Sequence, residues 1–563
     1  MKRNHFFYYF YVKELDNSKI LNSKIWVIIL TVLLFYSFIV YGYRLPVDFG
    51  TYVDEGDFGR DLYYFYLVSK GNLPYVNFNW IYGPLTPLLY GLTFKIFGVS
   101  AFIALTLWYL QYIVCVYLIY YIIKDFSNHL FAFLGAMLFI IYYEGFLLLV
   151  FNHITGLLFI LLCWFILNKY LDSGNNKYLY LFSVSCFLIT ITKLNMGLAF
   201  TFPIFLILAG YNLLNKKDFK HVIKAGLLYL LLCLFVYMPL ILYSPVDQLH
   251  KSFPYSSKYL TMIPHTFIQS LLYADNEFIS IFNSHINGAL LILFSIYTSN
   301  IWYFIVALSG IAMSIVIYKT KGKENTDYLY IIILSTTIIS CSNEFFLIKS
   351  FYSLRLWCLC SAIILIFYIL NYILIILKDN KYLKPLMIIV TAIFAVGFMA
   401  KSYLFFFPNS LNSVYCSQER LKISTTRLPW HIAMSKTIQY ILDHTKQTDK
   451  LLAIPYCSLY NFVSKREAPS RYTEFLLISG VTEEDEKKVI KDIEKNRVNT
   501  ILYINKVGPS YTGFGYFGES HCKILDRYIK DNYRIDNSYY SDYLNGIKIP
   551  VIFYLRKTPY NDK

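Results

Sequence analysis

Charged residues are scarce in this sequence. Only 15% of its 563 residues are Asp, Glu, Lys or Arg, whereas 57% are hydrophobic. Soluble globular domains carry charge on about 25% of their residues, so the composition excludes a protein of that class. The net charge of +16 gives little support to nucleic-acid binding, because the basic residues lie mainly in short loops between apolar runs.

Cysteine pairs with the spacing of metal ligands are lacking as well. The ten Cys occur singly, mostly inside apolar runs, and Cys358 and Cys360 are too close together to clasp zinc from a loop. Three others, Cys416, Cys457 and Cys522, lie in the C-terminal tail, where an odd number allows one disulfide but no full framework. Cysteine usage therefore assigns the chain to neither an oxidising nor a reducing compartment.

Long apolar runs dominate the chain. A bilayer core about 30 Å thick needs roughly 20 apolar residues per helix. Eleven runs approach this length, near 25–43, 101–123, 129–143, 146–167, 178–192, 197–213, 223–243, 287–317, 328–345, 354–377 and 385–406. No small-residue cleavage site follows the first run, so we expect an uncleaved anchor. The sequence predicts an α-helical polytopic membrane protein with about 11 transmembrane helices.

The distribution of lysine predicts the orientation. Lysines concentrate in alternate short connections, which the positive-inside rule places in the cytoplasm together with residues 1–24. The outer side then holds two long loops, 44–100 and 244–286, and everything after the membrane module 25–406. We therefore expect a multi-pass protein of the inner or plasma membrane.

The tail, 407–563, has a different pattern. Helical patterns at 435–445, 483–495 and 521–532 alternate with strand patterns at 451–454, 500–504 and 548–555. Such alternation favours a small C-terminal α/β domain. With an odd number of spans, this domain is extracytoplasmic.

A cluster of carboxylates follows the first apolar run. It contains Asp54, Glu55, Asp57 and Asp61, in a chain otherwise poor in charge. Asp57 and Asp61 are four residues apart on a predicted amphipathic helix, and Arg60 adjoins Asp61, so we expect this pair on a solvated helix face. Asp54 and Glu55 precede that helix and need another explanation.

Motifs around this cluster resemble a known superfamily. In the first outer loop they are Gly71-x-x-Pro74-Tyr75, Gly83-Pro84-x-x-Pro87 and Phe97-Gly98; further on come Lys193-x-Asn195-x-Gly197 and, in the tail, Ile454-Pro455-Tyr456 and Arg466-x-x-Pro469-x-Arg471-Tyr472. Their order resembles the GT-C superfamily of integral-membrane glycosyltransferases, in the branch of protein O-mannosyltransferase-like and aminoarabinose-transferase-like proteins. The resemblance implies a GT-C-like fold and a sugar donor carried on polyprenyl phosphate.

The resemblance also implies an essential acid in the first outer loop, which here matches Asp54 and Glu55. A carboxylate can take the proton of an acceptor hydroxyl, so we expect Asp54 to be the base and Glu55 its helper. Glu144, at the start of the second outer loop, is a candidate second acid. Asn152 and His153 lie within a predicted span, where we expect a neighbouring helix to satisfy the histidine.

Cations are needed to hold the departing phosphate, because negative charge develops there. The candidates near the outer face are Lys193, Arg355 and Lys349, with Lys251 and Lys258 in the large outer loop. Lys193 is the best placed, because it occupies the turn where the resembled branch has its own lysine.

The expected function is transfer of a sugar from a polyprenyl-phosphate donor to a hydroxyl of a glycan, lipid or protein in the cell envelope. A transporter or flippase of lipid-linked saccharides is the first alternative, although paired repeats and broken helices are not evident. An envelope polysaccharide polymerase or ligase is the second. No cofactor is required by the sequence, although the acids could support one divalent metal ion.

Overall fold

The structure is a computed structural model of the whole chain. It describes residues 24–44, 56–80, 82–146, 151–215, 218–243, 301–322, 326–342, 351–376, 413–416, 421–424, 428–476, 481–504, 516–544 and 547–558. The large outer loop predicted at 244–286 and the last predicted span, 385–406, lie outside these residues.

A helix lies at each of the first ten predicted spans. They are α2 (Ile25–Arg44), α5 (Ala101–Phe126), α6 (His129–Phe146), α7 (Phe151–Ser173), α8 (Asn176–Thr192), α9 (Leu194–Leu214), α10 (Lys220–Tyr243), α16 (Ile301–Lys321), α17 (Asp327–Ser342) and α18 (Phe351–Ile376). Five segments are long and apolar enough to cross a membrane: α5, α7, α9, α10 and residues 303–320 of α16. The chain is therefore a multi-pass membrane protein, and the count of eleven spans stays a prediction.

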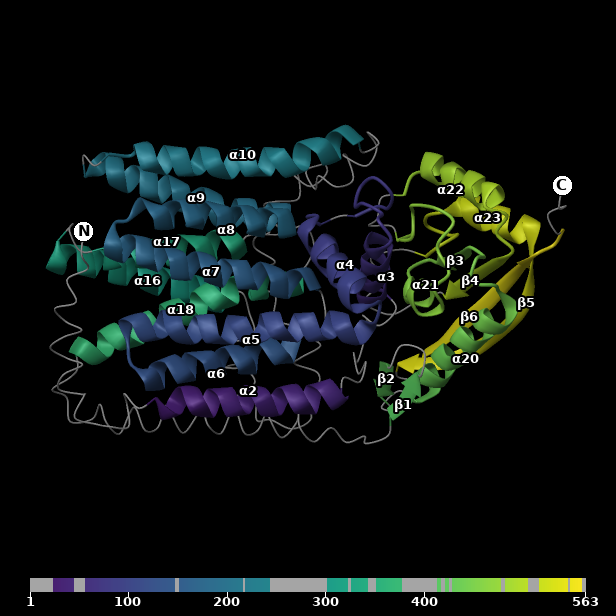
Figure 1. Ribbon diagram of the computed structural model, residues 1–563, viewed down its shortest axis with the longest axis horizontal. Helices are drawn as coiled ribbons and strands as arrows, with labels where there is room; N and C mark the ends of the chain where they lie inside the picture. Colours follow the sequence, from purple (N-terminus) through teal and green to yellow (C-terminus); the bar gives the residue numbers. More distant parts are fainter. Residues whose placement is uncertain are drawn as a thin grey trace.

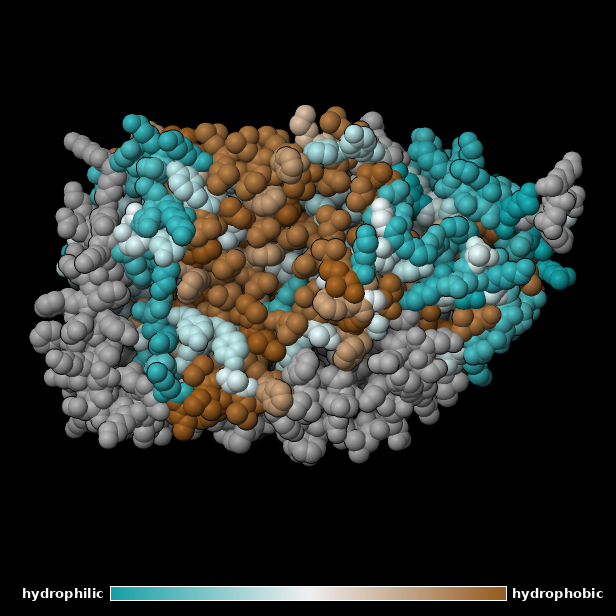
Figure 2. Space-filling model, viewed as in Figure 1, coloured by the Kyte–Doolittle hydropathy of each residue, from teal (hydrophilic) through white to brown (hydrophobic). Residues whose placement is uncertain are grey.

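The ten helices form one bundle. They lie side by side with their long axes in a common direction (Figure 1). A broad band of hydrophobic residues covers this bundle. Hydrophilic residues lie at the end of the bundle opposite the C-terminal sheet, on the left of the view, and over the sheet itself (Figure 2). Polar side chains inside the bundle bond across helices: Trp164 Nε1 of α7 donates to Ser361 Oγ of α18 at 3.0 Å. Such bonds replace the water that the bilayer core lacks.

Two short helices separate the bundle from the C-terminal elements. These are α3 (Asp57–Ser69) and α4 (Leu85–Phe97), which pack together at one end of the bundle (Figure 1). Helix α3 ends at Lys70, before Gly71, whose φ of +93° suits glycine. The predicted amphipathic helix of the first outer loop is thus confirmed, but most of its side chains are buried.

The C-terminal elements build a four-stranded sheet. Its strands are β3 (Leu451–Ile454), β4 (Thr500–Ile504), β5 (Tyr533–Leu544) and β6 (Ile547–Arg556), in the order β3-β4-β6-β5, with β3 parallel to β4 and the other pairs antiparallel. The helices are α20 (Leu428–His444), α21 (Leu459–Ser464), α22 (Glu483–Lys495) and α23 (Lys523–Asn532). A separate hairpin joins β1 (Ser413–Cys416) to β2 (Leu421–Ser424).

Both faces of this sheet are covered, because successive side chains of a strand point to opposite sides. On β3, Leu451 and Ala453 belong to the apolar cluster that includes α20, α21 and α3, whereas Leu452 and Ile454 belong to the cluster of α22 and α23. All six C-terminal elements predicted from the sequence are present, and β5, α21 and the hairpin are additional. We call residues 428–558 the C-terminal unit.

Candidate functional site

The first turn of α3 packs directly on the C-terminal unit. A Cβ added at Gly56 would lie 2.6 Å from the ring of Tyr456, and one at Gly59 would lie 2.5 Å from Cβ of Leu459. Two glycines one turn apart therefore allow the segment between β3 and α21 to approach the backbone of α3. This contact brings the start of the first loop together with a segment about 400 residues further along the chain.

A buried arginine lies at the centre of this contact. Arg60 is 1% exposed, and its Nε and Nη2 donate to Oδ1 of Asp61 at 2.9 and 2.8 Å. Its Nη1 lies 2.8 Å from Oδ1 of Asp57 and donates to the hydroxyl of Tyr456 at 3.1 Å. Nε lies 3.7 Å from Oε1 of Glu474. We call these five residues the Arg60 network.

The expectation of a solvated face was wrong for Asp61. Its side chain is fully buried, whereas that of Asp57 is 40% exposed. Burial raises the pKa of Asp61 to about 7, against the lowering effect of Arg60. Burial likewise raises the pKa of Glu474. The reason is tertiary, because the C-terminal unit covers the face of α3 that the sequence left open to solvent.

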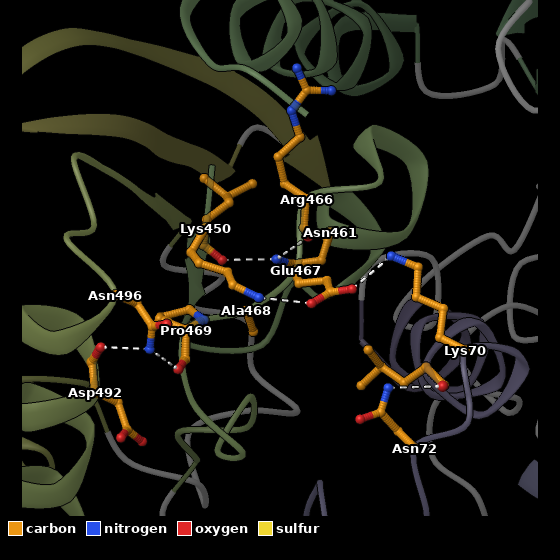
Figure 3. A network of polar contacts seen from close by, with 12 residues as sticks. Lys70, Asn72, Lys450, Asn461, Arg466, Glu467, Ala468, Pro469, Asp492 and Asn496 are labelled. Atoms are coloured by element: carbon orange, nitrogen blue, oxygen red, sulfur yellow. Dashed lines mark hydrogen bonds and ion pairs between the residues drawn. The ribbon is translucent and has the colours of Figure 1, made fainter. Parts of the chain in front are cut away.

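Further polar bonds fasten the rest of the first loop to the C-terminal unit. Glu467 accepts from Lys70 and from Lys450, each at 2.7 Å, as Figure 3 shows. Arg471 donates through Nε to Asn79 Oδ1 at 3.0 Å. Its Nη2 donates to the carbonyl of Tyr75 at 2.6 Å, so Arg471 of the tail motif contacts Tyr75 of a first-loop motif.

The first loop also reaches the turn between α8 and α9. The backbone N–H of Gly83 donates to the carbonyl of Thr192 at 3.0 Å, and a Cβ at Gly83 would lie 2.1 Å from the carbonyl oxygen of Ile191. Trp80 Nε1 donates to the Gly83 carbonyl at 2.9 Å. Only glycine permits this approach, which places Tyr82 beside the residue that follows Thr192.

That residue is Lys193, which ends α8 and caps the start of α9. It is 8% exposed, and its Nζ lies 5.3 Å from the ring centre of Tyr82 and 5.9 Å from that of Trp357. Among the described residues, no carboxylate forms an ion pair with it. Burial lowers its pKa to about 8, with Asp57 raising and Arg60 lowering it. Lys193 is thus a buried cation, close to the Arg60 network and available to an anion.

Asn152 and His153, at the start of α7, are buried without hydrogen-bond partners on three atoms. These are both amide atoms of Asn152 and Nδ1 of His153. The expectation that a neighbouring helix satisfies this histidine was therefore wrong for Nδ1. The helix that packs here, α18, presents the ring of Trp357 at 5.8 Å from the imidazole.

The other predicted site residues are described only in part. Asp54, Glu55, Lys349, Lys251 and Lys258 lie outside the described residues. Arg355 belongs to the second turn of α18, whose side chains before Trp357 are not described. Glu144 belongs to the last turn of α6, which ends at Phe146. Their roles stay predictions.

Sequence reasoning missed the partners that the C-terminal unit contributes. Tyr456 belongs to a tail motif, which was the available signal, whereas Glu474 had none. Within the described part of the chain, no group of three His, Cys, Asp or Glu side chains is arranged to hold a metal ion.

Comparisons with known proteins give neighbours of similar fold. No family model matches the sequence, and no curated protein does. Among solved structures, the oligosaccharyltransferase AglB from Archaeoglobus fulgidus, in complex with an inhibitory peptide and a dolichol-phosphate, shares 13% identity at a TM-score of 0.46, over 96% of this chain and 75% of AglB. ArnT from Cupriavidus metallidurans shares 10% identity at a TM-score of 0.41, over 93% and 97%.

These neighbours are GT-C membrane glycosyltransferases. At TM-scores below 0.5, the likeness carries no argument about substrate or mechanism. The chemistry of the site therefore depends on the residues of this chain itself.

Proposed function

We propose that the chain is a membrane glycosyltransferase that moves a sugar from a polyprenyl-phosphate donor to an acceptor hydroxyl at the outer face of the membrane. The observation that carries this proposal is the position of Lys193. It is a buried cation without a carboxylate partner among the described residues, and the first loop is bonded to its turn through Gly83. A buried ammonium of this kind suits a phosphate.

The acids of the first loop supply the other half of the chemistry. Asp54 and Glu55 directly precede Gly56, so three Cα steps of about 3.8 Å each connect Asp54 to Asp57, the first residue of α3. The ring of Tyr82 supports a common location of the two parts, because its centre lies 5.3 Å from Cζ of Arg60 and 5.3 Å from Nζ of Lys193. The carboxylates of Asp57 and Asp61 are engaged by Arg60, which leaves Asp54 as the candidate base.

The reaction exchanges one bond for another. The acceptor oxygen forms a bond to the anomeric carbon of the sugar, and the bond from that carbon to the phosphate oxygen breaks. The leaving polyprenyl phosphate takes the electron pair, while Asp54 takes the proton of the acceptor hydroxyl. Lys193 offsets the charge that develops on the phosphate, with Arg355 and Lys349 as further candidates. Arg60 is excluded from this role, because three carboxylates already surround it.

The topology follows from the same proposal. Residues 1–24 are cytoplasmic, 25–406 form the catalytic membrane module, and 407–563 form an extracytoplasmic α/β domain. The lipid donor enters sideways from the bilayer, because its long chain is too apolar for a soluble site. Reporter fusions after Lys323 and at Lys563 should report opposite sides of the membrane, and two cytoplasmic signals would contradict the orientation.

The deciding experiment compares two donors. The full chain, purified into lipid nanodiscs, is given a labelled sugar on polyprenyl phosphate or on a nucleotide, with envelope lipids and glycans as acceptors. We expect transfer from the lipid donor only, and we expect Asp54→Asn to abolish turnover while the lipid donor still binds. Glu55→Gln should lose less activity. Asp443→Asn, an exposed carboxylate on α20, is the matched control.

Efficient transfer from the nucleotide sugar without a carrier lipid would show that the donor class is wrong. Wild-type turnover in Asp54→Asn would show that the base is wrong. Movement of an intact lipid-linked saccharide across the bilayer without transfer would support the transporter alternative.

A further inference from the structure

One face of α7 carries polar groups that the fold leaves unused. Asn152 is fully buried and His153 is 7% exposed. Among the described residues, neither atom of the Asn152 amide has a hydrogen-bond partner, and neither does Nδ1 of His153. Burying a polar atom without a hydrogen-bond partner costs free energy of folding. Several such atoms in one region therefore indicate that a bound ligand supplies the missing partners.

The geometry of α7 places these groups on the side of α18. Positions 152 and 153 lie four and three residues before Gly156, and residues with this spacing share a helix face. A Cβ at Gly156 would lie 2.0 Å from the benzo edge of Trp357. The glycine thus admits the indole ring against this face, and the Trp357 ring is 5.8 Å from that of His153.

Trp357 contributes a fourth unused group. It is 1% exposed, and its Nε1–H has no hydrogen-bond acceptor in the part of the chain that the structure describes. The other side of the cluster is Lys193, whose Nζ lies 5.9 Å from the centre of the Trp357 ring. The neighbouring turn of α7 is different: the hydroxyl of Thr155 donates to Gln111 Oε1 at 2.9 Å. At this end of α7, the unsatisfied polar atoms among the described residues are those of Asn152 and His153.

The chemistry of the four groups restricts the ligand. Trp357 Nε1 and Asn152 Nδ2 can only donate, Asn152 Oδ1 can only accept, and a neutral imidazole does both. The oxygens of an ionised phosphate accept hydrogen bonds. A phosphate at this place would therefore leave Asn152 Oδ1 without a donor. A metal cation is disfavoured by the ammonium of Lys193. Hydroxyl groups donate and accept at once, and a sugar carries several on neighbouring carbons.

We propose that Asn152, His153 and Trp357 bind the sugar hydroxyls of the donor, while Lys193 binds its phosphate. This rests on the proposed function and divides the donor between two neighbouring parts of one site. The division makes the three residues determinants of sugar specificity. Lys193 contributes equally for every donor of this lipid class.

Binding measurements can separate the two parts. The full chain in nanodiscs is titrated with bare polyprenyl phosphate and with polyprenyl phosphate carrying mannose, glucose or arabinose. Asn152→Leu removes two hydrogen-bonding atoms at similar volume, so we expect the Kd of the best sugar lipid to rise about tenfold. The Kd of bare polyprenyl phosphate should stay within about twofold. Lys193→Ala should weaken binding of both lipids.

A second variant and a control distinguish a loss of sugar binding from a loss of folding. Trp357→Phe keeps an aromatic ring beside Gly156 but removes Nε1–H, and should raise the Kd of the sugar lipid about fivefold. Thr201→Val on α9 removes another buried hydroxyl without a partner. Thr201 lies eight residues beyond Lys193, about 12 Å along the helix, and its variant should change neither Kd.

The outcomes are distinguishable. If wild-type protein binds the lipids but Asn152→Leu and Trp357→Phe alter both Kd values equally, or neither, the sugar subsite is refuted and the proposed function stands. If wild-type protein binds none of these lipids, the proposed function fails and the subsite with it.

Discussion

Two buried cations near the same end of the bundle have opposite surroundings. Arg60 on α3 is 1% exposed and lies among the carboxylates of Asp57, Asp61 and Glu474. Lys193 is 8% exposed and faces aromatic rings, with no ion pair in the part of the chain that is described. Burial alone therefore does not identify a functional charge in this protein. The presence or absence of a partner within the fold does.

The side chains suit these two situations. The planar guanidinium of arginine presents five donors and can bind several carboxylates at once, which fits a structural connection between α3 and the C-terminal unit. The ammonium of lysine is compact, and its pKa responds readily to burial. The first arrangement connects α3 to the C-terminal unit, and the second is the one that we propose for binding the donor phosphate.

The largest expected effect comes from breaking the Arg60 network. Arg60→Met removes one partner and leaves buried carboxylates unpaired, so we expect the free energy of unfolding to fall by about 3–5 kcal/mol. Thermal unfolding in detergent, under conditions where it is reversible, measures this. The double variant Arg60→Met/Asp61→Leu should recover part of the loss, because the buried charge is gone as well. Arg527→Met, at an exposed position of α23, is the control. A loss below about 1 kcal/mol in Arg60→Met contradicts a structural role.

The next largest effect is expected on activity, and it distinguishes Lys193 from Arg60. Lys193→Ala should lower kcat/KM for the lipid donor about 100-fold, because a phosphate loses its buried counter-charge. Thermal stability should not fall, since an unpaired buried ammonium does not stabilise the fold. Lys193→Arg should keep part of the activity. Lys95→Ala, which replaces an exposed lysine of α4, should keep all of it. Unfolding of Lys193→Ala together with loss of activity would instead assign Lys193 to the structural group.

The pH dependence sharpens the same distinction. Burial lowers the pKa of Lys193 to about 8, so the ammonium that we propose as the phosphate ligand is lost as the pH rises through that value. We expect kcat/KM to fall about tenfold per pH unit above it, since this ratio reports the free enzyme. Lys193→Arg should remove the fall, because arginine stays charged. A profile identical in both proteins would show that another group titrates.

Stability should change in the opposite direction. The folded-state pKa of Lys193 lies below the value of about 10.4 of a free lysine, so the unfolded chain binds more protons between these two values. Stability relative to Lys193→Met should therefore rise as the pH increases from about 8 to 10. Paired chemical-unfolding curves at three pH values in this window measure the difference.

The smallest effect tests an exposed ion pair of the same interface. Lys70 is 45% exposed at its side chain, and Glu467 keeps its bond to Lys450 when Lys70 is removed. Lys70→Ala should therefore cost less than about 1 kcal/mol of stability and leave activity unchanged. A loss as large as that of Arg60→Met would show that the two connections act as one unit.

Local patterns predicted most of the secondary structure. The periodic helix α22 and the short apolar strands β3 and β4 lie at their predicted residues, because composition and spacing alone mark such segments. Strand β5 was missed, since its polar sequence has no clear alternation and its pairing with β6 decides its conformation. The short α21 was missed too, because it is stabilised by packing against α3.

The sequence by itself determined that the chain is a multi-pass helical membrane protein, that an α/β fold follows, and that Lys193 is a candidate phosphate ligand. Apolar length and local periodicity suffice for the first two conclusions, because they depend on neighbouring residues. The tertiary structure alone decided that Asp61 is a buried partner of Arg60 and that the ring of Trp357 lies near both His153 and Lys193. The partners of a side chain depend on which distant segment of the chain packs against it. The close approaches at Gly56, Gly83 and Gly156 bring such distant segments together.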